Sequence, residues 1–298
     1  MEGLEAAMAK ARAARNELRL GVGRSQAARA ASPALAPAPA PAMGPALNPT
    51  LDPAEAGLAA RLWDWSSLPL LEVSAQQAKS RRINALGDQE FASYYGLLRA
   101  RVLRQMKEKG WTRLAVTSPR PKSGKSTISL NLALSLARSD DLRVILMDFD
   151  LRKPSLARLL GLKTPPNITG LLRPGAIFKD FAVRYGSNLA VCSNRARVQN
   201  SAELLQGYSI KDALDRIEGD WRPDIMIFDT PPMQGNDDNM GFFAHVDCAM
   251  IVAAAGHDTL AQIDRCEQEV AGLTNVLGTV LNKCRYAESG AGYDSSYY

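Results

Sequence analysis

Between residues 113 and 281 the sequence alternates short, almost uninterrupted apolar runs with longer stretches of helical periodicity. Such apolar runs are expected for strands covered on both faces, and their alternation with helices favours a parallel sheet between two helical layers. We therefore predict a doubly wound, mainly parallel α/β fold in three α/β/α layers, with its ligand site at the carboxyl ends of the strands. The expected strands are 113–117, 143–148, 188–192, 224–229, 247–253 and 276–281, and the expected helices are 90–110, 124–138, 155–161, 201–218 and 259–273.

A phosphate-binding motif joins the first expected strand to the helix that follows it. The sequence SPRPKSGKST, residues 118–127, ends in the G-K-S of the pattern G-x-x-x-x-G-K-[ST], although Pro119 occupies the first glycine position. Backbone N–H groups and the helix N-terminus would cradle phosphates there, with Lys125 neutralising their charge and Ser126 binding Mg²⁺. The residues expected to contact the nucleotide are Pro121, Lys122, Ser123, Gly124, Lys125, Ser126 and Thr127.

Polar residues at the ends of three further strands extend this site. In VILMDFDLRKP, residues 144–154, two carboxylates at Asp148 and Asp150 can face the same metal-bound phosphates. In DIMIFDTPP, residues 224–232, a buried strand delivers Asp229, the usual way to hold the Mg²⁺ shell. Asn282, at the end of VLGTVLNK, can present an amide donor and acceptor to a base edge, and we predict that it recognises adenine.

Composition excludes several other classes of protein. The formal net charge of the 298-residue chain is only +5, so no nucleic-acid partner is expected. The four cysteines lack metal-ligand spacing and are expected to be free thiols in a reducing cytoplasm, while His245 and His257 are expected to have no catalytic role. No apolar run approaches the roughly 20 residues that span a bilayer, and no signal peptide is evident.

The chain is expected to have five parts. Residues 1–31 form a basic segment with a helix at 1–20, which is either solvated or attracted to an anionic membrane surface. Residues 32–60 are an Ala/Pro-rich linker, and residues 61–85, with two tryptophans, are expected to dock on the main domain or on a partner. Residues 86–285 form the nucleotide-binding domain, and residues 286–298 are a tyrosine-rich tail expected to be disordered.

From about residue 86 onward the chain resembles the bacterial tyrosine kinases of capsule and exopolysaccharide assembly. The string DFDLRKPSLARLLGL is the most specific match, followed by DTPP, by NSAELL at 200–205 with Ser201 in place of proline, and by the tyrosine tail. The family is a deviant-Walker branch of the P-loop ATPases, which also contains ParA- and MinD-like proteins. The resemblance implies catalytic roles for Lys125, Asp148 and Asp150, one aspartate taking the tyrosine proton, and metal binding by Ser126, Asp148 and Asp229.

The resemblance also implies a function and its partners. It implies an ATP- and Mg²⁺-dependent autokinase, a homo-oligomer that phosphorylates Tyr286, Tyr293, Tyr297 and Tyr298 and regulates polysaccharide polymerisation and export. Because the chain is similar to the stand-alone cytoplasmic form, it would sit at the inner membrane through a transmembrane co-polymerase or activator chain, with a phosphotyrosine phosphatase resetting it. A ParA/MinD-like assembly or localisation ATPase without kinase activity is the main alternative, and a degenerate ATPase acting as a scaffold is the weaker one.

Two departures from the family pattern bear on activity and assembly. The family loop usually reads S-x-x-P-G-E-G-K-S, so that Lys122 replaces a glycine and Ser123 a glutamate. If that position needs a positive φ, Lys122 costs about 1–2 kcal/mol, partly offset if its ammonium reaches a phosphate. The family's oligomer motif E-x-x-R-x-x-R aligns with Ser93, Gly96 and Arg99, and only Arg99 matches it.

Overall fold

The computed structural model describes residues 64–87, 89–163, 167–194, 196–235 and 237–284. The expected N-terminal helix, the Ala/Pro-rich linker and the tyrosine tail lie outside these residues. All described residues belong to the second of two compact units into which the chain divides, residues 51–298.

Seven strands form one sheet in the order β3-β4-β2-β5-β1-β6-β7. All neighbouring strands are parallel except β3, which runs antiparallel to β4. The doubly wound, mainly parallel fold predicted from the sequence is thereby confirmed. The strands are β1 (Arg113–Thr117), β2 (Val144–Asp148), β3 (Ala182–Tyr185), β4 (Leu189–Cys192), β5 (Ile225–Asp229), β6 (Cys248–Ala254) and β7 (Asn275–Asn282).

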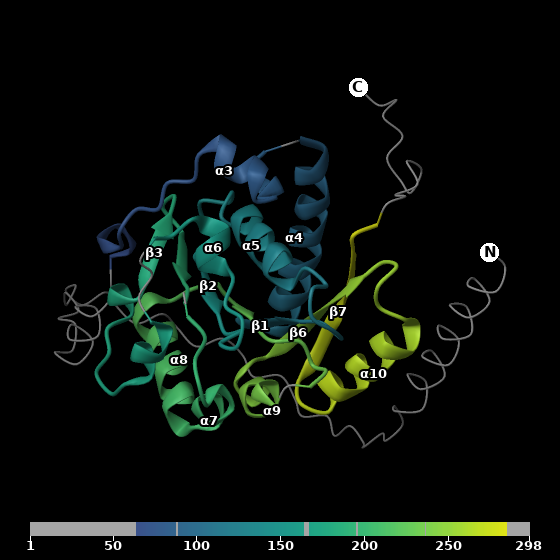
Figure 1. Ribbon diagram of the computed structural model, residues 1–298. Helices are drawn as coiled ribbons and strands as arrows, with labels where there is room; N and C mark the ends of the chain where they lie inside the picture. Colours follow the sequence, from purple (N-terminus) through teal and green to yellow (C-terminus); the bar gives the residue numbers. More distant parts are fainter. Residues whose placement is uncertain (1–63, 88, 164–166, 195, 236, 285–298) are drawn as a thin grey trace, which may run out of the picture. The chain divides into compact units, whose positions relative to one another are not determined.

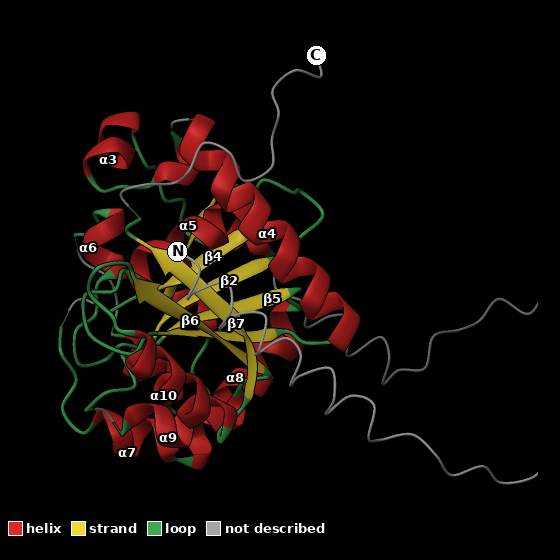
Figure 2. Cartoon of the chain, turned by 90° about the vertical axis from the view of Figure 1, so that its right-hand side faces the viewer, coloured by secondary structure: helices red, strands yellow, loops and turns green. Residues whose placement is uncertain are grey.

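Helices cover both faces of this sheet. Figure 1 shows α3 to α6 on one face and α7 to α10 on the other, and the turned view in Figure 2 shows the same division. The helices are α3 (Ala75–Ser80), α4 (Gln89–Lys109), α5 (Lys125–Leu136), α6 (Leu156–Leu160), α7 (Ser201–Gln206), α8 (Tyr208–Trp221), α9 (Asp238–Phe242) and α10 (Leu260–Ala271). Short 3-10 helices lie between them at Trp65–Ser67 (η1), Asn84–Leu86 (η2), Ile168–Leu172 (η3), Phe178–Asp180 (η4) and Phe243–His245 (η5).

The near-continuous apolar runs arise because the central strands contribute to two cores. In β1, Ala115 packs into the cluster under α7 to α10, while Leu114 and Val116 pack into the cluster under α4 to α6. Strands β2 and β5 alternate in the same way, as the period-two geometry of a strand requires. The edge strand β7 is less buried, and all of its residues are exposed or half-buried.

The structure corrects one expectation about secondary structure and contains three elements that were not expected. The single helix expected at 201–218 is two helices, because Gly207 has extended backbone with φ −71° and ψ 153° and ends α7 before α8 begins. Strand β3 was not expected, since only Ala182 of its four residues is buried and it lacks a long apolar run. Helices α3 and α9 are short, and neither was expected from helical periodicity.

The segment before α3 packs on the α/β core. Trp65 is buried against Trp221, with ring centroids 5.8 Å apart in an edge-on arrangement, and its Nε1 donates to the Trp221 carbonyl at 3.2 Å. Further along, Leu71 N donates to the Arg184 carbonyl at 2.7 Å, so that this segment pairs briefly with β3. The described part of the expected docking segment therefore lies on the chain's own core.

Candidate nucleotide and metal site

The loop between β1 and α5 has the backbone of an anion-binding turn. Gly124 is the N-cap of α5 in a left-handed conformation with φ 100°, and Lys125 begins the helix. The N–H groups of the first helical turn have no partner within the helix and carry its positive dipole end. Lys125 and Ser126 are the first two residues of α5. Lys125 is only 6% exposed and Ser126 is half-buried. The expected phosphate site thus has the strand–loop–helix context that its motif requires.

Lys122 adopts the conformation that a glycine would adopt freely. Its φ is +68°, so the condition stated from the glycine pattern, a position that needs the left-handed region, is met. A side chain in that region costs roughly 1–2 kcal/mol per residue. The loop is therefore held in this shape by contacts made elsewhere.

Asp148 and Asp229 form the acidic centre of the site. They end the adjacent strands β2 and β5 as direct register partners, and both are fully buried. The Asp148 Oδ2 atom accepts hydrogen bonds from the backbone N–H groups of Ser155 and Leu156, each at 2.9 Å. Asp148 Oδ1 and Asp229 Oδ2 are buried polar atoms without a hydrogen-bond partner.

Burial of like charges shifts the acidity of this pair. Loss of solvation, with the neighbouring Asp229 carboxylate as the next cause, raises the pKa of Asp148 well above its ordinary value. Burial also raises the pKa of Asp229 to about 7, although Lys125 and hydrogen bonds from Ser126 and Ser129 act in the opposite direction. A positive charge placed beside these two oxygens would favour the ionised carboxylates and so counteract both pKa shifts.

Asp150 is the more accessible carboxylate of this motif. It is 7% exposed, and its Oδ1 accepts a hydrogen bond from Lys153 N at 3.0 Å. Burial raises its pKa, and the nearby Lys125 ammonium partly counteracts that effect. Lys125 is thus close enough to lower the pKa of both Asp150 and Asp229.

These donors fit a magnesium ion. Two carboxylate oxygens without hydrogen-bond partners beside a serine hydroxyl match a cation that takes one or two carboxylates and completes its shell with phosphates and water. Among the described residues, no group of three or more His, Cys, Asp or Glu side chains could hold a metal ion. The donor set therefore suits an ion bound together with a nucleotide better than an all-protein metal cage.

Arg152 ties the acidic motif to two other segments, a role that the sequence did not reveal. Its guanidinium contacts Asp238, with Nε to Oδ2 at 3.0 Å and Nη2 to Oδ1 at 2.9 Å, and it also contacts Asp237 at 2.5 Å. Asp238 is fully buried and also accepts from the Ser201 hydroxyl at 3.0 and 3.1 Å. Ser201, which replaces the proline of NPAELL, therefore joins α7 to this network.

Asn282 lies at the site, but its amide is used within the protein. Its Nδ2 donates to the Ser123 carbonyl at 2.9 Å, and its Oδ1 accepts from Lys283 N at 2.9 Å. A Cβ atom on Gly124 would lie 2.2 Å from Asn282 Nδ2, so a larger residue there would displace the asparagine side chain. Adenine recognition by Asn282 stays a prediction, and in this arrangement the side chain braces the phosphate loop.

The other residues singled out in the sequence have structural surroundings. Cys192, Cys248 and Cys266 are buried free thiols, and Cys284 is an exposed one, as expected. Arg99, the remaining residue of the oligomer motif, donates to the Ser135 carbonyl of α5 at 2.8 Å and thus makes an internal contact. The four tyrosines proposed as phosphoacceptors lie outside the described residues.

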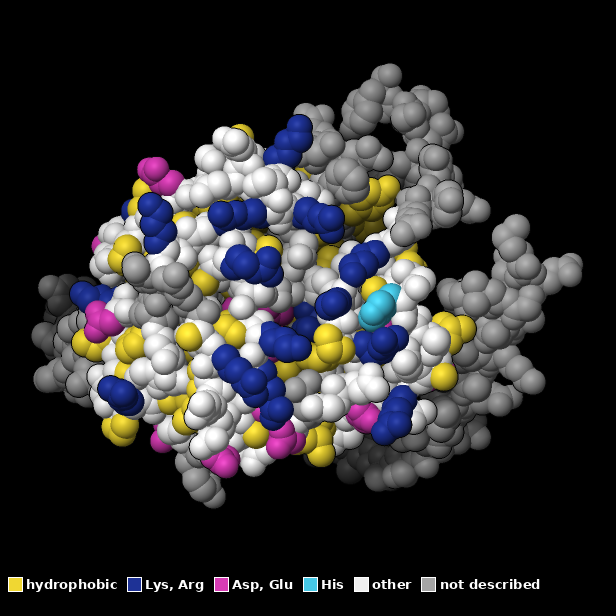
Figure 3. Space-filling model, in the orientation of Figure 1, with side chains coloured by type: hydrophobic (Ala, Val, Ile, Leu, Met, Phe, Trp, Pro, Cys, Tyr) yellow, Lys and Arg dark blue, Asp and Glu magenta, His cyan; other side chains and the backbone are white. Residues whose placement is uncertain are grey.

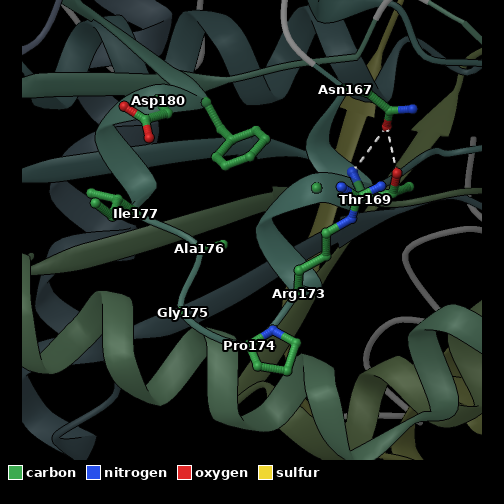
Figure 4. Close-up of a pocket in the computed structure, with 10 residues that line it drawn as sticks. Asn167, Thr169, Arg173, Pro174, Gly175, Ala176, Ile177 and Asp180 are labelled. Atoms are coloured by element: carbon green, nitrogen blue, oxygen red, sulfur yellow. Dashed lines mark hydrogen bonds between the residues drawn. The ribbon is translucent and has the colours of Figure 1, made fainter.

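One face of the molecule is rich in basic side chains at its centre. Figure 3 shows Lys and Arg side chains across the centre of one face, with acidic side chains mainly toward its margin. A separate hollow of about 510 Å³ lies at η3 and η4, where Asn167 Oδ1 accepts from Thr169 N at 3.0 Å and from its hydroxyl at 2.8 Å (Figure 4). None of the residues that line this hollow belongs to the predicted nucleotide site.

Within the described residues, no helix is both long and apolar enough to cross a bilayer.

Comparison with known proteins identifies relatives of this chain. Residues 111–293, more than half of the chain, match the family model ParA, described as NUBPL iron-transfer P-loop NTPase. The chain is 30% identical over 178 residues to the tyrosine-protein kinase CpsD of Streptococcus pneumoniae serotype 4, covering 57% of this chain and 75% of that protein. It is 29% identical over 212 residues to the tyrosine-protein kinase YwqD of Bacillus subtilis, covering 70% and 81%.

Longer relatives and solved structures agree with these matches. The tyrosine-protein kinase ptk of Acinetobacter johnsonii is 32% identical over 186 residues, or 60% of this chain, but the match spans only 24% of that relative. The kinase domain of the Escherichia coli tyrosine kinase ETK superposes with a TM-score of 0.63 at 23% identity, covering 80% of this chain and 96% of that domain. The BceF tyrosine kinase domain gives a TM-score of 0.58 at 23% identity, covering 77% and 97%. Both structures share the fold described above.

Proposed function

The chain belongs to the bacterial tyrosine kinases within the ParA-type P-loop NTPases, and from this premise we propose that it is an ATP-dependent protein-tyrosine autokinase. One observation carries the proposal. Asp148 and Asp229 are register partners at the ends of β2 and β5, and Lys125, at the start of α5, is close enough to lower the pKa of Asp150 and Asp229. Phosphoryl transfer needs a cation for the phosphates, carboxylates for Mg²⁺ and an acceptor for the hydroxyl proton, and this group contains all three.

Each side chain has a distinct task in the proposed reaction. The loop N–H groups and the Lys125 ammonium bind and orient the nucleotide phosphates. Ser126, Asp148 and Asp229 would hold Mg²⁺, which supplies further neutralisation of phosphate charge. The tyrosine oxygen attacks the γ-phosphorus, the bond from that phosphorus to the bridging oxygen of the ADP leaving group breaks, and the phenolic proton passes to Asp150.

Asp150 is the proposed proton acceptor because of its position relative to Asp148. Asp148 is fully buried, with Oδ2 occupied by two backbone N–H groups and Oδ1 in the proposed metal site. Asp150 keeps some exposure, and its raised pKa brings a carboxylate closer to the acidity suited to a general base near neutral pH.

The proposed substrate is the chain's own tyrosine cluster on a neighbouring copy. Tyr286, Tyr293, Tyr297 and Tyr298 fall within the last 13 residues, and a segment of that length reaches roughly 40 Å when extended. Each phosphate adds about −1.5 to −2 charges at neutral pH, so four modified tyrosines would repel a similarly modified neighbour. We infer a cycle in which unmodified chains assemble, phosphorylate one another and separate.

The resemblance to stand-alone capsule kinases supports the proposed cellular setting. In that setting the chain is peripheral at the inner membrane through a transmembrane co-polymerase or activator chain, and a phosphotyrosine phosphatase resets it. Its output is regulation of capsule or exopolysaccharide polymerisation and export.

Intact mass after incubation with Mg-ATP tests the proposal directly. The full chain should gain phosphates one at a time, mapped to Tyr286–Tyr298, and a Lys125→Met variant of unchanged circular dichroism should gain none. A second arm adds the cytoplasmic segment of the membrane activator. If ATP is hydrolysed and drives assembly, yet no phosphotyrosine forms in either arm, the chain is instead a nucleotide-switched assembly ATPase of the ParA/MinD kind.

A further inference from the structure

The phosphate loop of this chain is held by contacts from outside the loop. Lys122 has φ +68°, a conformation that glycine adopts at little cost and that other residues adopt only when their surroundings impose it. Its neighbour Ser123 is fully buried. The contacts that fix these two residues therefore decide whether the loop is ready for a nucleotide.

The Ser123 hydroxyl points to a carboxylate far away in sequence. Its Oγ lies 2.9 Å from Asp258 Oδ2 and 2.9 Å from the Arg120 carbonyl. The Arg120 carbonyl already accepts from the Ser118 hydroxyl at 2.7 Å. A serine hydroxyl has a single proton to donate, and of its two possible acceptors the Asp258 carboxylate is the charged and therefore the stronger one.

Asp258 is itself firmly placed between β6 and α10. Its side chain is fully buried, and its Oδ2 also accepts from Ala254 N, at the end of β6, at 2.7 Å. His257 Nδ1 lies 3.0 Å from Oδ1. The carboxylate therefore connects the end of a central strand to the phosphate loop. A hydrogen bond to an ionised acceptor is roughly twice as strong as one between neutral groups.

Two further contacts reach the same loop from the end of β7. Asn282 Nδ2 donates to the Ser123 carbonyl at 2.9 Å, and Lys283 Nζ donates to the Lys122 carbonyl at 2.5 Å. In addition, Arg120 of the loop donates from its Nη1 to the carbonyl of His257, which follows β6, at 3.1 Å. The residues at the ends of β6 and β7 thus surround the peptide units of Lys122 and Ser123.

We propose that Asp258 is a positioning residue of the nucleotide site, which through Ser123 holds the phosphate loop in the conformation that Lys122 alone would disfavour. The inference rests on the nucleotide-binding part of the proposed function. It does not depend on kinase activity or on the tyrosine tail. In related loops a glycine adopts the positive φ freely, whereas here a hydrogen bond to a buried carboxylate stabilises the same loop conformation.

Equilibrium binding of Mg-ADP to the full chain tests this proposal. Asp258→Ala and Ser123→Ala each remove the hydrogen bond between these two side chains. Each should weaken Mg-ADP binding roughly 5- to 30-fold, the factor that corresponds to the cost of about 1–2 kcal/mol for the left-handed conformation of Lys122. The exposed Asp264 of α10 offers a matched control, and Asp264→Ala should change the affinity less than about twofold. Circular dichroism and the urea midpoint would establish that each variant is folded.

The same substitution made in a Lys122→Gly protein distinguishes positioning of the phosphate loop from an effect on general stability. In Lys122→Gly the loop reaches φ +68° without strain, so adding Asp258→Ala there should cost less than about threefold in Mg-ADP affinity. Equal losses in both backgrounds, or folded Asp258→Ala and Ser123→Ala proteins with native affinity, would overturn the proposal. If the unaltered chain does not bind Mg-ADP, both this proposal and the proposed function fail. If the unaltered chain binds Mg-ADP but the effect of Asp258→Ala is the same with Lys122 as in the Lys122→Gly background, only the positioning role of Asp258 is refuted.

Discussion

Asp148 and Asp229 lie opposite each other as the last residues of β2 and β5, both fully buried and each with one side-chain oxygen that has no hydrogen-bond partner. Two like charges taken out of water on neighbouring strands destabilise the protein that holds them. The arrangement is useful once a cation lies between them. The ligand-free protein is thus less stable than it would be with neutral side chains at these two positions.

Asp148→Asn should stabilise the metal-free protein while abolishing tail phosphorylation. The amide oxygen can still accept from Ser155 N and Leu156 N, and its NH₂ group can donate to Asp229 instead of repelling it. Replacing a buried charge by a neutral isostere should raise Tm by about 3–6 °C in EDTA, measured by calorimetry. The exposed Asp141→Asn is the control, and a lower Tm for Asp148→Asn than for Asp141→Asn would contradict the account.

The same pair predicts how stability depends on pH. Because the folded pKa values of Asp148 and Asp229 lie above the ordinary value of 3.8, the native state binds more protons than the unfolded chain. Their contribution to stability is therefore greatest below about pH 4 and is lost as the pH rises toward 7. The Tm of the metal-free protein minus that of Asp148→Asn should fall between pH 5 and 7.5, and a constant difference would count against raised pKa values.

Arg152→Ala should be strongly destabilising. Asp238 is fully buried, and removal of its cation leaves a carboxylate without a charge partner in the interior, at a cost of about 3–5 kcal/mol. Arg104→Ala is a matched control, since the side chains of Arg104 and Glu108 are 78% and 60% exposed and their pairing contributes about 0.5 kcal/mol or less. Urea denaturation measures both, and a second substitution, Asp238→Asn, should recover part of the loss. Equal midpoints for the two arginine variants would refute the prediction.

Trp65→Ala should show that the segment before α3 is part of the folded domain. Its indole packs edge-on against Trp221, and truncation of such a buried aromatic side chain costs about 3–5 kcal/mol. Trp65→Phe keeps a ring but loses the Nε1 hydrogen bond to the Trp221 carbonyl, a loss nearer 1 kcal/mol. Leu70, which is 55% exposed, provides the control variant Leu70→Ala. A native urea midpoint for Trp65→Ala would show that the segment is only loosely attached.

The sequence alone was enough to place the main chemical groups at one edge of one sheet. Lys125 begins a helix directly after an apolar run, while Asp148 and Asp229 end two further apolar runs, and parallel strands bring such ends together. The strand positions followed for the same reason, since burial on both faces leaves a local and nearly continuous apolar signal. Even the requirement for a positive φ at Lys122 could be stated as a condition from the glycine pattern.

Only the tertiary structure decided how that site is held in shape. The contact of Ser123 with Asp258, the use of the Asn282 amide on the loop, and the pairing of Arg152 with Asp238 join residues that are 86 to 159 positions apart. No local pattern encodes such pairs, because a polar side chain at a strand end has several possible partners of equal chemistry. The antiparallel β3 and the break at Gly207 were hidden for a related reason, since an edge strand and a helix joint depend on what packs beside them. The identity of the chemical groups is therefore local, whereas their arrangement depends on the whole fold.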